Sequence, residues 1–175
     1  MKDAQFGLGT FGDVTHGPGG VPLPFADVIR NVVAQAVLAD EVGVDAIILG
    51  EHHRDDFAIS TPETILAGIA TTTSRITLSS GVTVLSSDDP IRVFQRFATI
   101  DALSGGRAEI IAGRGSFTES FPLFGYELEN YQVLFEEKLN LLSELLKETP
   151  VTWSGTTRPA LSNQDVFPKS HSGNI

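Results

Sequence analysis

The sequence predicts an α/β fold built around a parallel sheet, and three observations support this prediction. Short apolar segments of strand length alternate with longer segments whose apolar residues recur every three or four positions. The connecting loops are rich in Gly, Pro and Asp. Residues 45–50 form a continuous apolar run, as expected for a strand covered on both faces. Such βαβ units form either a barrel or an open doubly wound sheet, and periodicity alone does not separate the two.

Signals at the helix ends place the elements along the chain. The first helix begins near Phe25, and Gly43 is a natural stop because glycine readily adopts the left-handed conformation of a C-terminal cap. Pro62 suits the first turn of the second helix, and Asp89 can cap the third. The fourth helix has leucines along one side. The expected order is strand 5–10, helix 25–43, strand 45–50, helix 62–73, strand 76–85, helix 89–104, strand 108–112 and helix 130–147.

The pattern of elements changes near residue 150. Residues 1–150 hold four βα units, whereas residues 151–175 are polar and carry the prolines and glycines typical of a hairpin followed by irregular chain. With 175 residues, 41% of them hydrophobic, the chain is long enough to bury one sizeable core.

Composition excludes several classes of function. The chain has no cysteine, so disulfides, thiolate catalysis and Cys-ligated zinc are ruled out. A net charge of −10 disfavours binding to nucleic acid or to anionic lipid. The apolar runs are too short to cross a bilayer, and Met1 is not followed by the pattern of a secretory leader. We therefore expect a cytoplasmic protein.

Chemically unusual residues follow the second predicted strand. In parallel α/β folds, functional groups collect where strands end at their carboxyl side. Glu51, His52 and His53 occupy such a position, and a histidine there could act as base, proton donor or hydrogen-bond partner near neutral pH. A polar surface loop accounts for the same residues. Because adjacent residues of an extended chain point in opposite directions, the two histidines do not predict a shared metal ion, and no metal site is expected.

Glycines mark the ends of the third and fourth predicted strands. Gly81 and Val82 lie in a run of small residues, which in a buried strand indicates either a bulge or the close approach of a flat ligand. Gly113 and Arg114 end the fourth strand, where open backbone and a guanidinium group would suit an anion. A turn with a solvated arginine explains this second pair equally well.

A resemblance to a known family rests on segments that follow one another with consistent spacing. They are Glu51-His52-His53, Ser80 to Leu85 leading to Pro90, Leu103 to Arg107, and Ile111 to Phe117. In this order they resemble the bacterial-luciferase-like, flavin-dependent monooxygenases over residues 6–161. The resemblance implies a (β/α)8 TIM barrel truncated here to about four βα units, the N-terminal half, with an irregular tail and without strands five to eight.

The resemblance also implies an activity and roles for particular residues. Such an enzyme binds reduced FMN at the carboxyl ends of its strands and uses O2 to oxidise a small organic substrate, with a flavin reductase as a possible supplier of reduced FMN. His52 matches the catalytic histidine, and Glu51 would lie beside the flavin. Gly81-Val82 matches a position where the family often has a non-proline cis peptide bond. Gly113 and Arg114 match the segment along the flavin, with Arg114 as the phosphate contact.

The absence of half of the expected barrel leaves other functions open and suggests an oligomeric state. The chain could be a non-catalytic flavoprotein or an inactive fragment of such an enzyme. A deazaflavin-dependent oxidoreductase of the same superfamily is a further alternative, although Glu51-His52-His53 favours FMN. An open four-stranded sheet leaves two unpaired edges and an apolar face. We therefore expect a homo-oligomer, most simply a dimer whose halves cover each other's sheets.

Overall fold

The computed structural model describes residues 4–175. The expectation that the chain does not begin with a secretory leader rests on residues 1–3, which lie outside the described residues. The main sheet consists of β1 (Gly7–Thr10), β2 (Ala46–Leu49), β3 (Thr77–Val84) and β4 (Ala108–Gly113). The helices between these strands are α1 (Phe25–Val42), α2 (Pro62–Ala70) and α3 (Pro90–Ser104). All three strand pairs are parallel, and the spatial order is β1-β2-β3-β4. The predicted parallel α/β fold is confirmed.

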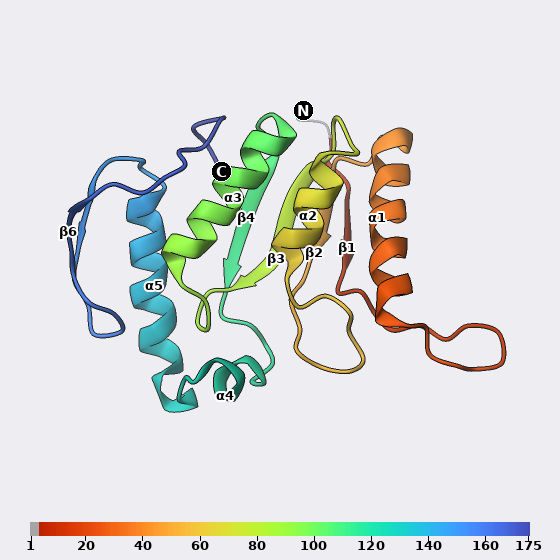
Figure 1. Ribbon diagram of the computed structural model, residues 1–175, viewed down its shortest axis with the longest axis horizontal. Coiled ribbons are helices and arrows are strands. Elements are labelled where there is room, and N and C mark those ends of the chain that lie inside the picture. The colour runs from red at the N-terminus through yellow and green to blue at the C-terminus, as the bar shows by residue number, and fades with distance from the viewer. Residues whose placement is uncertain (1–3) are drawn as a thin grey trace.

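The strand order also decides between a barrel wall and a doubly wound sheet. A doubly wound sheet reverses its strand order at a switch point, whereas here every strand pairs with its neighbour in the sequence. Figure 1 shows α2 and α3 on the same side of the sheet, in front of it. This one-sided, consecutive arrangement is that of a barrel wall.

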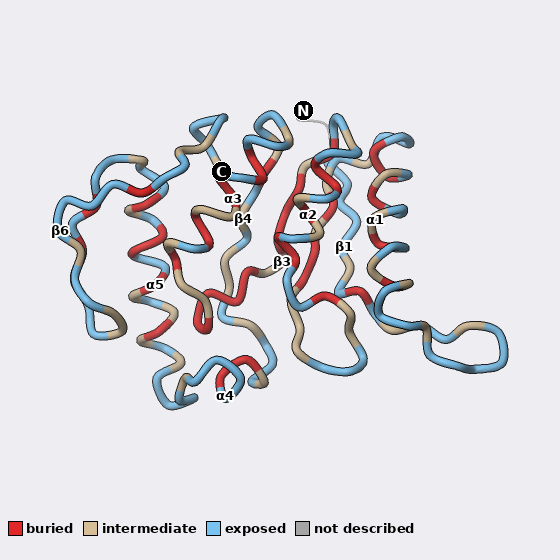
Figure 2. The backbone as a smooth tube through the Cα atoms, viewed as in Figure 1, coloured by how far each residue is buried: buried red, intermediate tan, exposed pale blue. Residues whose placement is uncertain are grey.

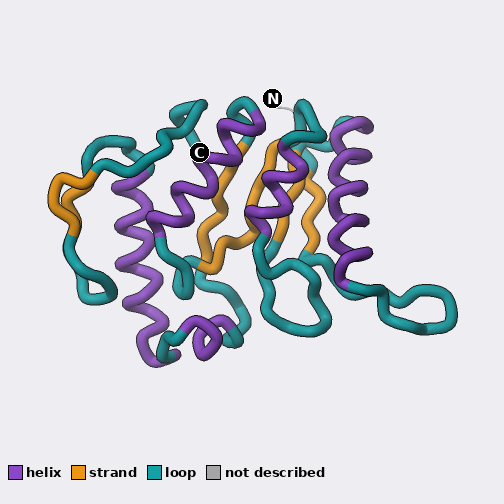
Figure 3. Tube along the Cα trace, viewed as in Figure 1, coloured by secondary structure: helices purple, strands orange, loops and turns teal. Residues whose placement is uncertain are grey.

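Beyond β4 the chain forms elements that only partly match the sequence expectations. The long helix α5 (Tyr131–Leu145) was expected, as was a hairpin, formed by β5 (Val151–Trp153) and β6 (Leu161–Gln164), which lies beside α5 in Figure 3. The short helix α4 (Ser120–Phe124) and the 3-10 turn η1 (Leu128–Asn130) were not expected. Trp153 packs into the same hydrophobic core as the helices, and its Nε1 donates to Asn140 Oδ1 at 2.9 Å.

Helix ends follow the local signals, with one difference. The Asp89 side chain accepts hydrogen bonds from the N–H groups of the first turn of α3, and Gly43 takes the left-handed conformation after α1. The second helix, α2, ends at Ala70 and not near residue 73. The hydroxyls of Thr71 and Thr73 donate to carbonyl groups of its last turn, a local bond that competes with continuation of the helix.

The hydrophobic core lies between the sheet and its helices. Ile47 and Leu49 of β2 point toward the helices and are fully buried, whereas Ala46 and Ile48 on the other face are only half-buried. The expectation that this strand is covered on both faces was therefore wrong for residues 4–175, because the helices cover one face of the four-stranded sheet and the other face is only partly covered. Figure 2 shows buried residues along α2, α3 and the central strands, while β1 is largely exposed.

Two charged side chains bind the backbone near the amino ends of the strands and hold this edge of the sheet together. The Asp40 carboxylate accepts hydrogen bonds from the backbone N–H groups of Ser74, Arg75 and Ile76. Burial alone would raise the pKa of Asp40, but these donors bring it below its ordinary value. The Arg107 guanidinium donates to carbonyl groups between α2 and β3 and to the Thr73 hydroxyl.

The carboxyl ends of all four strands meet at one edge of the sheet. The loops that follow β1 and β2 and the helix α4 gather at this edge, at the bottom of Figure 1. Among residues 4–175, none of the helices has the length and hydropathy that a bilayer span requires.

Candidate functional site

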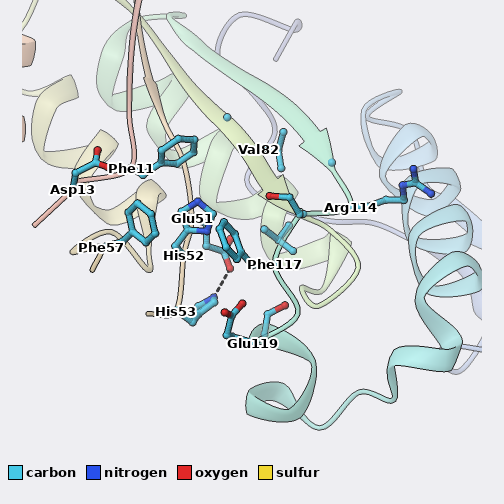
Figure 4. A pocket seen from close by; sticks show the side chains of 16 residues that line it. Phe11, Asp13, Glu51, His52, His53, Phe57, Val82, Arg114, Phe117 and Glu119 are labelled. Carbon is cyan, nitrogen blue, oxygen red and sulfur yellow. Dashed lines mark hydrogen bonds and ion pairs between the residues drawn. The ribbon is translucent and has the colours of Figure 1, made fainter. Parts of the chain in front are cut away.

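A cavity of about 670 Å³ lies at the carboxyl edge of the sheet, lined by residues of β3 and β4 and of the loops that follow β1, β2 and β4 (Figure 4). This volume is in the range of small-molecule sites. The lining residues are Phe11, Asp13, Glu51, His52, His53, Phe57, Gly81, Val82, Val84, residues 113–117, Glu119 and Ser120.

Four rings from three different loops form one end of the cavity, and we call Phe11, His52, Phe57 and Phe117 the aromatic cluster. The His52 ring is at its centre, with ring centroids 4.8 Å from Phe11, 4.5 Å from Phe57 and 4.6 Å from Phe117. Burial lowers the pKa of His52, although the nearby Glu119 opposes this effect. Burial therefore favours the neutral form of the imidazole.

Gly50 makes room for the aromatic cluster. A Cβ atom at this position would lie 2.1 Å from the Phe11 ring and 3.0 Å from the carbonyl oxygen of Gly81. The first distance is shorter than a Cβ atom tolerates, and the second is at the tight limit of such contacts. Glycine at the end of β2 therefore lets the Phe11 ring reach across the strand end toward His52.

The neighbouring histidine has a different partner. His53 Nε2 lies 2.8 Å from Glu51 Oε1, and the two side chains are only 11% and 9% exposed. Burial raises the pKa of Glu51, while the hydrogen bond with His53 opposes this rise. The His53 ring also meets Phe124 edge to face, with centroids 5.1 Å apart.

The contact between Glu51 and His53 was not predicted from the sequence, although the sequence contains a signal for it. In extended chain, residues two apart share a side, so Glu51 and His53 point together while His52 points away. The different partners of His52 and His53 agree with that alternation. Within residues 4–175, the structure contains no group of three His, Asp or Glu side chains arranged to hold a metal ion.

The third strand bends at the cavity floor. The register of β3 against β4 shifts between Gly81 and Thr83, which agrees with a bulge, one of the two interpretations of the run of small residues. The Gly81-Val82 peptide bond is cis, as the sequence resemblance implies. A Cβ atom at Gly81 would lie 2.2 Å from the Ile48 side chain, and one at Gly113 would lie 2.6 Å from Val82. Both glycines are therefore needed for close packing of the strands themselves.

Arg114 occupies the other end of the cavity. Its guanidinium carbon lies 5.4 Å from the centroid of the Tyr131 ring and 6.0 Å from that of Phe135, and its Nη1 donates to Gln132 Oε1 at 3.2 Å. Figure 4 shows the side chain extended toward α5, away from Phe11 and Phe57. The cavity thus runs from an aromatic end at β1 and β2 to a cationic end beside α5.

Arg54 joins two loops through contacts with residues that line the cavity. Its Nε and Nη2 donate to the two carboxylate oxygens of Asp56 at 2.9 and 3.1 Å, and its Nη1 donates to Glu119 Oε1 at 3.4 Å. The guanidinium carbon also lies 5.1 Å from the centroid of the Phe117 ring. This arginine connects the loop after β2 with the loop after β4.

The structure brings all of the residues predicted for the site to this one cavity. Their individual roles stay predictions. They are Glu51, His52, Gly81, Val82, Gly113 and Arg114.

Comparison with known proteins relates the chain to one family. The profile of the family described as luciferase-like monooxygenase matches residues 5–174. The N-acetyl-S-alkylcysteine monooxygenase of Bacillus subtilis (strain 168) is 31% identical over 126 residues, which cover 70% of this chain and 38% of that protein.

Solved structures share the fold. The monooxygenase RslO1 from Streptomyces bottropensis superposes with a TM-score of 0.85 at 24% identity, over 96% of this chain and 50% of that one. The oxygenating constituent of 3,6-diketocamphane monooxygenase from Pseudomonas putida, solved in complex with FMN, gives a TM-score of 0.80 at 20% identity, over 97% of this chain and 49% of that one. The chain thus spans about half the length of these solved chains, and 37% and 38% of two curated relatives.

Proposed function

Because this chain belongs to the luciferase-like monooxygenase family, which it matches over residues 5–174, we propose that its cavity binds reduced FMN for the oxidation of a small organic substrate by O2. The observation that carries this proposal is the meeting of Glu51, His52, Val82 and Arg114 in one cavity at the carboxyl ends of the strands. Bound reduced FMN would supply the two electrons needed to place one oxygen atom of O2 in the substrate and release the other as water.

The shape and chemistry of the cavity fit this cofactor. The side chains of Val82 and Val84 line the cavity and offer an apolar surface for a flat ring. The Arg114 guanidinium at one end has donor groups beyond its single bond to Gln132 and suits a phosphate. The ring would therefore lie over the β3 bulge, with the phosphate directed toward α5.

The titratable residues can handle protons beside such a ring. Burial lowers the pKa of His52 and so favours its neutral form, which is the form that can accept a proton. Glu51 lies next to it in the chain, and burial raises the pKa of its carboxyl group. The hydrogen bond between His53 and Glu51 holds the Glu51 side chain in place. The aromatic cluster gives this end of the cavity an apolar wall.

Turnover by this chain is conditional on a partner surface. Relatives build a barrel from about twice this length. Phe6 and Leu8, at the free β1 edge, are 70% and 39% exposed. We expect a second copy to cover this region in a dimer, and a monodisperse monomer in light scattering would contradict that expectation.

Titration of the purified chain with reduced FMN, oxidised FMN and a reduced deazaflavin tests the cofactor assignment. We expect reduced FMN to bind at micromolar concentration and more tightly than the deazaflavin. Tighter binding of the deazaflavin would favour the alternative oxidoreductase. Absence of binding by any of the three at millimolar concentration would identify the chain as an inactive fragment.

A further inference from the structure

The aromatic end of the cavity has a feature that the cofactor assignment does not use. Glu119 Oε1 accepts a hydrogen bond from Arg54, but its Oε2 is buried and has no hydrogen-bond partner within residues 4–175. The hydroxyl of Ser120 is also buried without a partner among these residues, on a side chain that is 4% exposed. Both residues line the cavity. Buried polar atoms in folded proteins are nearly always hydrogen-bonded, so these two atoms mark a place for a ligand group.

The two unpaired atoms can both accept hydrogen bonds, and this determines which ligand group fits beside them. A carboxylate oxygen only accepts hydrogen bonds, whereas a hydroxyl can both donate and accept. A ligand that offers an N–H or O–H donor satisfies Glu119, and Ser120 can bond to the same group. A ligand carboxylate would instead meet the negative charge of Glu119 at close range.

The surrounding charges also disfavour an anion. Asp13, Glu51 and Glu119 all line the cavity. Arg54, the cation nearest to this end, is already bound to both oxygens of Asp56 and to Glu119. Arg114 is turned toward α5 at the opposite end (Figure 4).

We propose that the substrate combines an aromatic or alicyclic body with a hydroxyl or amino hydrogen-bond donor and carries no negative charge. Its body contacts the aromatic cluster, and its donor bonds to Glu119 and Ser120. This assignment rests on the proposed function, because that function places the flavin ring over the β3 bulge and the phosphate at the Arg114 end. The rings of the aromatic cluster and the unpaired oxygen atoms of Glu119 and Ser120 line the part of the cavity that the flavin leaves free.

Three probes that share a phenyl ring test the proposal on the full chain without any cofactor. Benzylamine and benzyl alcohol should bind at least about tenfold more tightly than benzoate, as measured by calorimetry. In two-dimensional NMR spectra, the aromatic signals of His52 and Phe117 should move during the first two titrations. Benzoate affinity equal to or above that of the other two probes would overturn the proposal, as would ring shifts confined to residues outside the cavity or no binding of any probe at millimolar concentration.

A matched pair of variants separates the role of the carboxylate from net charge. Glu119→Gln should weaken benzylamine binding and narrow its advantage over benzoate. Glu129→Gln removes the same charge from an exposed position outside the cavity and should leave all three affinities unchanged. Equal effects of the two substitutions would overturn the role of Glu119.

A second pair tests the aromatic cluster. Phe117→Ala should weaken binding of benzylamine and benzyl alcohol by about tenfold, because a large apolar contact is lost. Phe25→Ala removes a half-exposed ring outside the cavity and should have no effect. Unchanged binding in Phe117→Ala would contradict the placement of the substrate body.

FMN titration of the same samples distinguishes failure of this inference from failure of the proposed function. A chain that binds reduced FMN but prefers benzoate retains the proposed function and refutes the substrate class. A chain that prefers benzylamine and benzyl alcohol but does not bind FMN supports the ligand class of the cavity and refutes the flavin function.

Discussion

The rings of His52 and Phe117 meet edge to face, with centroids 4.6 Å apart and an interplanar angle of 90°. The two residues come from loops after different strands, so this contact joins the two loops at the aromatic end of the cavity. It also contributes to the partial burial of His52, which is the main cause of its lowered pKa. The electrostatic state of the histidine therefore depends on a ring that belongs to another loop.

Removal of the Phe117 ring should raise the pKa of His52 toward its ordinary value. In Phe117→Ala the imidazole is more exposed to water, which stabilises its protonated form. An NMR pH titration of the His52 ring measures this change directly. The Phe25→Ala variant provides the control. An unchanged His52 titration in Phe117→Ala would show that residues other than Phe117 shield the imidazole from water.

His52 and Arg114 should affect different steps of the flavin reaction. His52→Ala should slow oxidation of bound reduced FMN by about a hundredfold while its affinity changes little, as expected for loss of a proton-transfer group. Stopped-flow absorbance measures the oxidation rate, and fluorescence titration measures affinity. Loss of affinity comparable with that of an Arg114 variant would show that His52 serves mainly in binding.

Arg114→Ala should weaken FMN binding by about tenfold to a hundredfold, because a charge-assisted hydrogen bond to phosphate is lost. Riboflavin lacks the phosphate, so its affinity should not change. Arg30→Ala, which alters an exposed arginine outside the cavity, provides the control. An equal loss of riboflavin affinity in Arg114→Ala would place the phosphate elsewhere.

Lys138 should make the free energy of unfolding depend on pH in the alkaline range. Its side chain is 5% exposed, donates to the carbonyl oxygen of Ser86 at 2.7 Å, and lies 4.0 Å from the centroid of the Tyr126 ring. Burial lowers its pKa from 10.5 to about 8. Between these values the unfolded chain holds a proton that the folded chain has released, so stability rises with pH.

Chemical denaturation at several pH values measures this effect. Relative to Lys138→Met, the wild-type chain should gain about 3 kcal/mol of unfolding free energy between pH 8 and 10.5. Lys147→Met changes an exposed lysine and should not alter the pH dependence. Parallel curves for the wild type and Lys138→Met would contradict the prediction.

Glu137 should contribute stability that disappears in acid. Burial alone would raise its pKa, but hydrogen bonds from the N–H and O–H groups of Thr156 and Thr157 lower it from 4.5 to about 2. The contribution is therefore complete above pH 4.5 and is lost as the pH falls to 2.

Glu137→Gln should cost about 1 to 2 kcal/mol at pH 7 after allowance for solvent screening, and almost nothing at pH 2. The Glu136→Gln variant, in which an exposed neighbour changes, provides the reference. A loss that is independent of pH would mean that shape and not charge determines the effect.

The order of elements and the position of the site were predictable from sequence, because both depend on local signals. Asp89 and Gly43 mark helix ends through their own conformations. Glu51 and Arg114 follow strands, and parallel strands bring their carboxyl ends to one edge. By contrast, the contact of Phe117 with His52 depends on how two loops fold over each other. The coverage of Ile48 could not be inferred either, since a continuous apolar run does not reveal how many layers cover it.

The central claim is that reduced FMN binds in the cavity at the carboxyl ends of the strands. Backbone amide NMR spectra, recorded anaerobically during a titration with reduced FMN, test this claim most directly. We expect the largest shifts on Gly81, Val82, Gly113 and Arg114, with the ring signals of His52 moving as well. Saturable binding that shifts other residues and leaves these unchanged would contradict it.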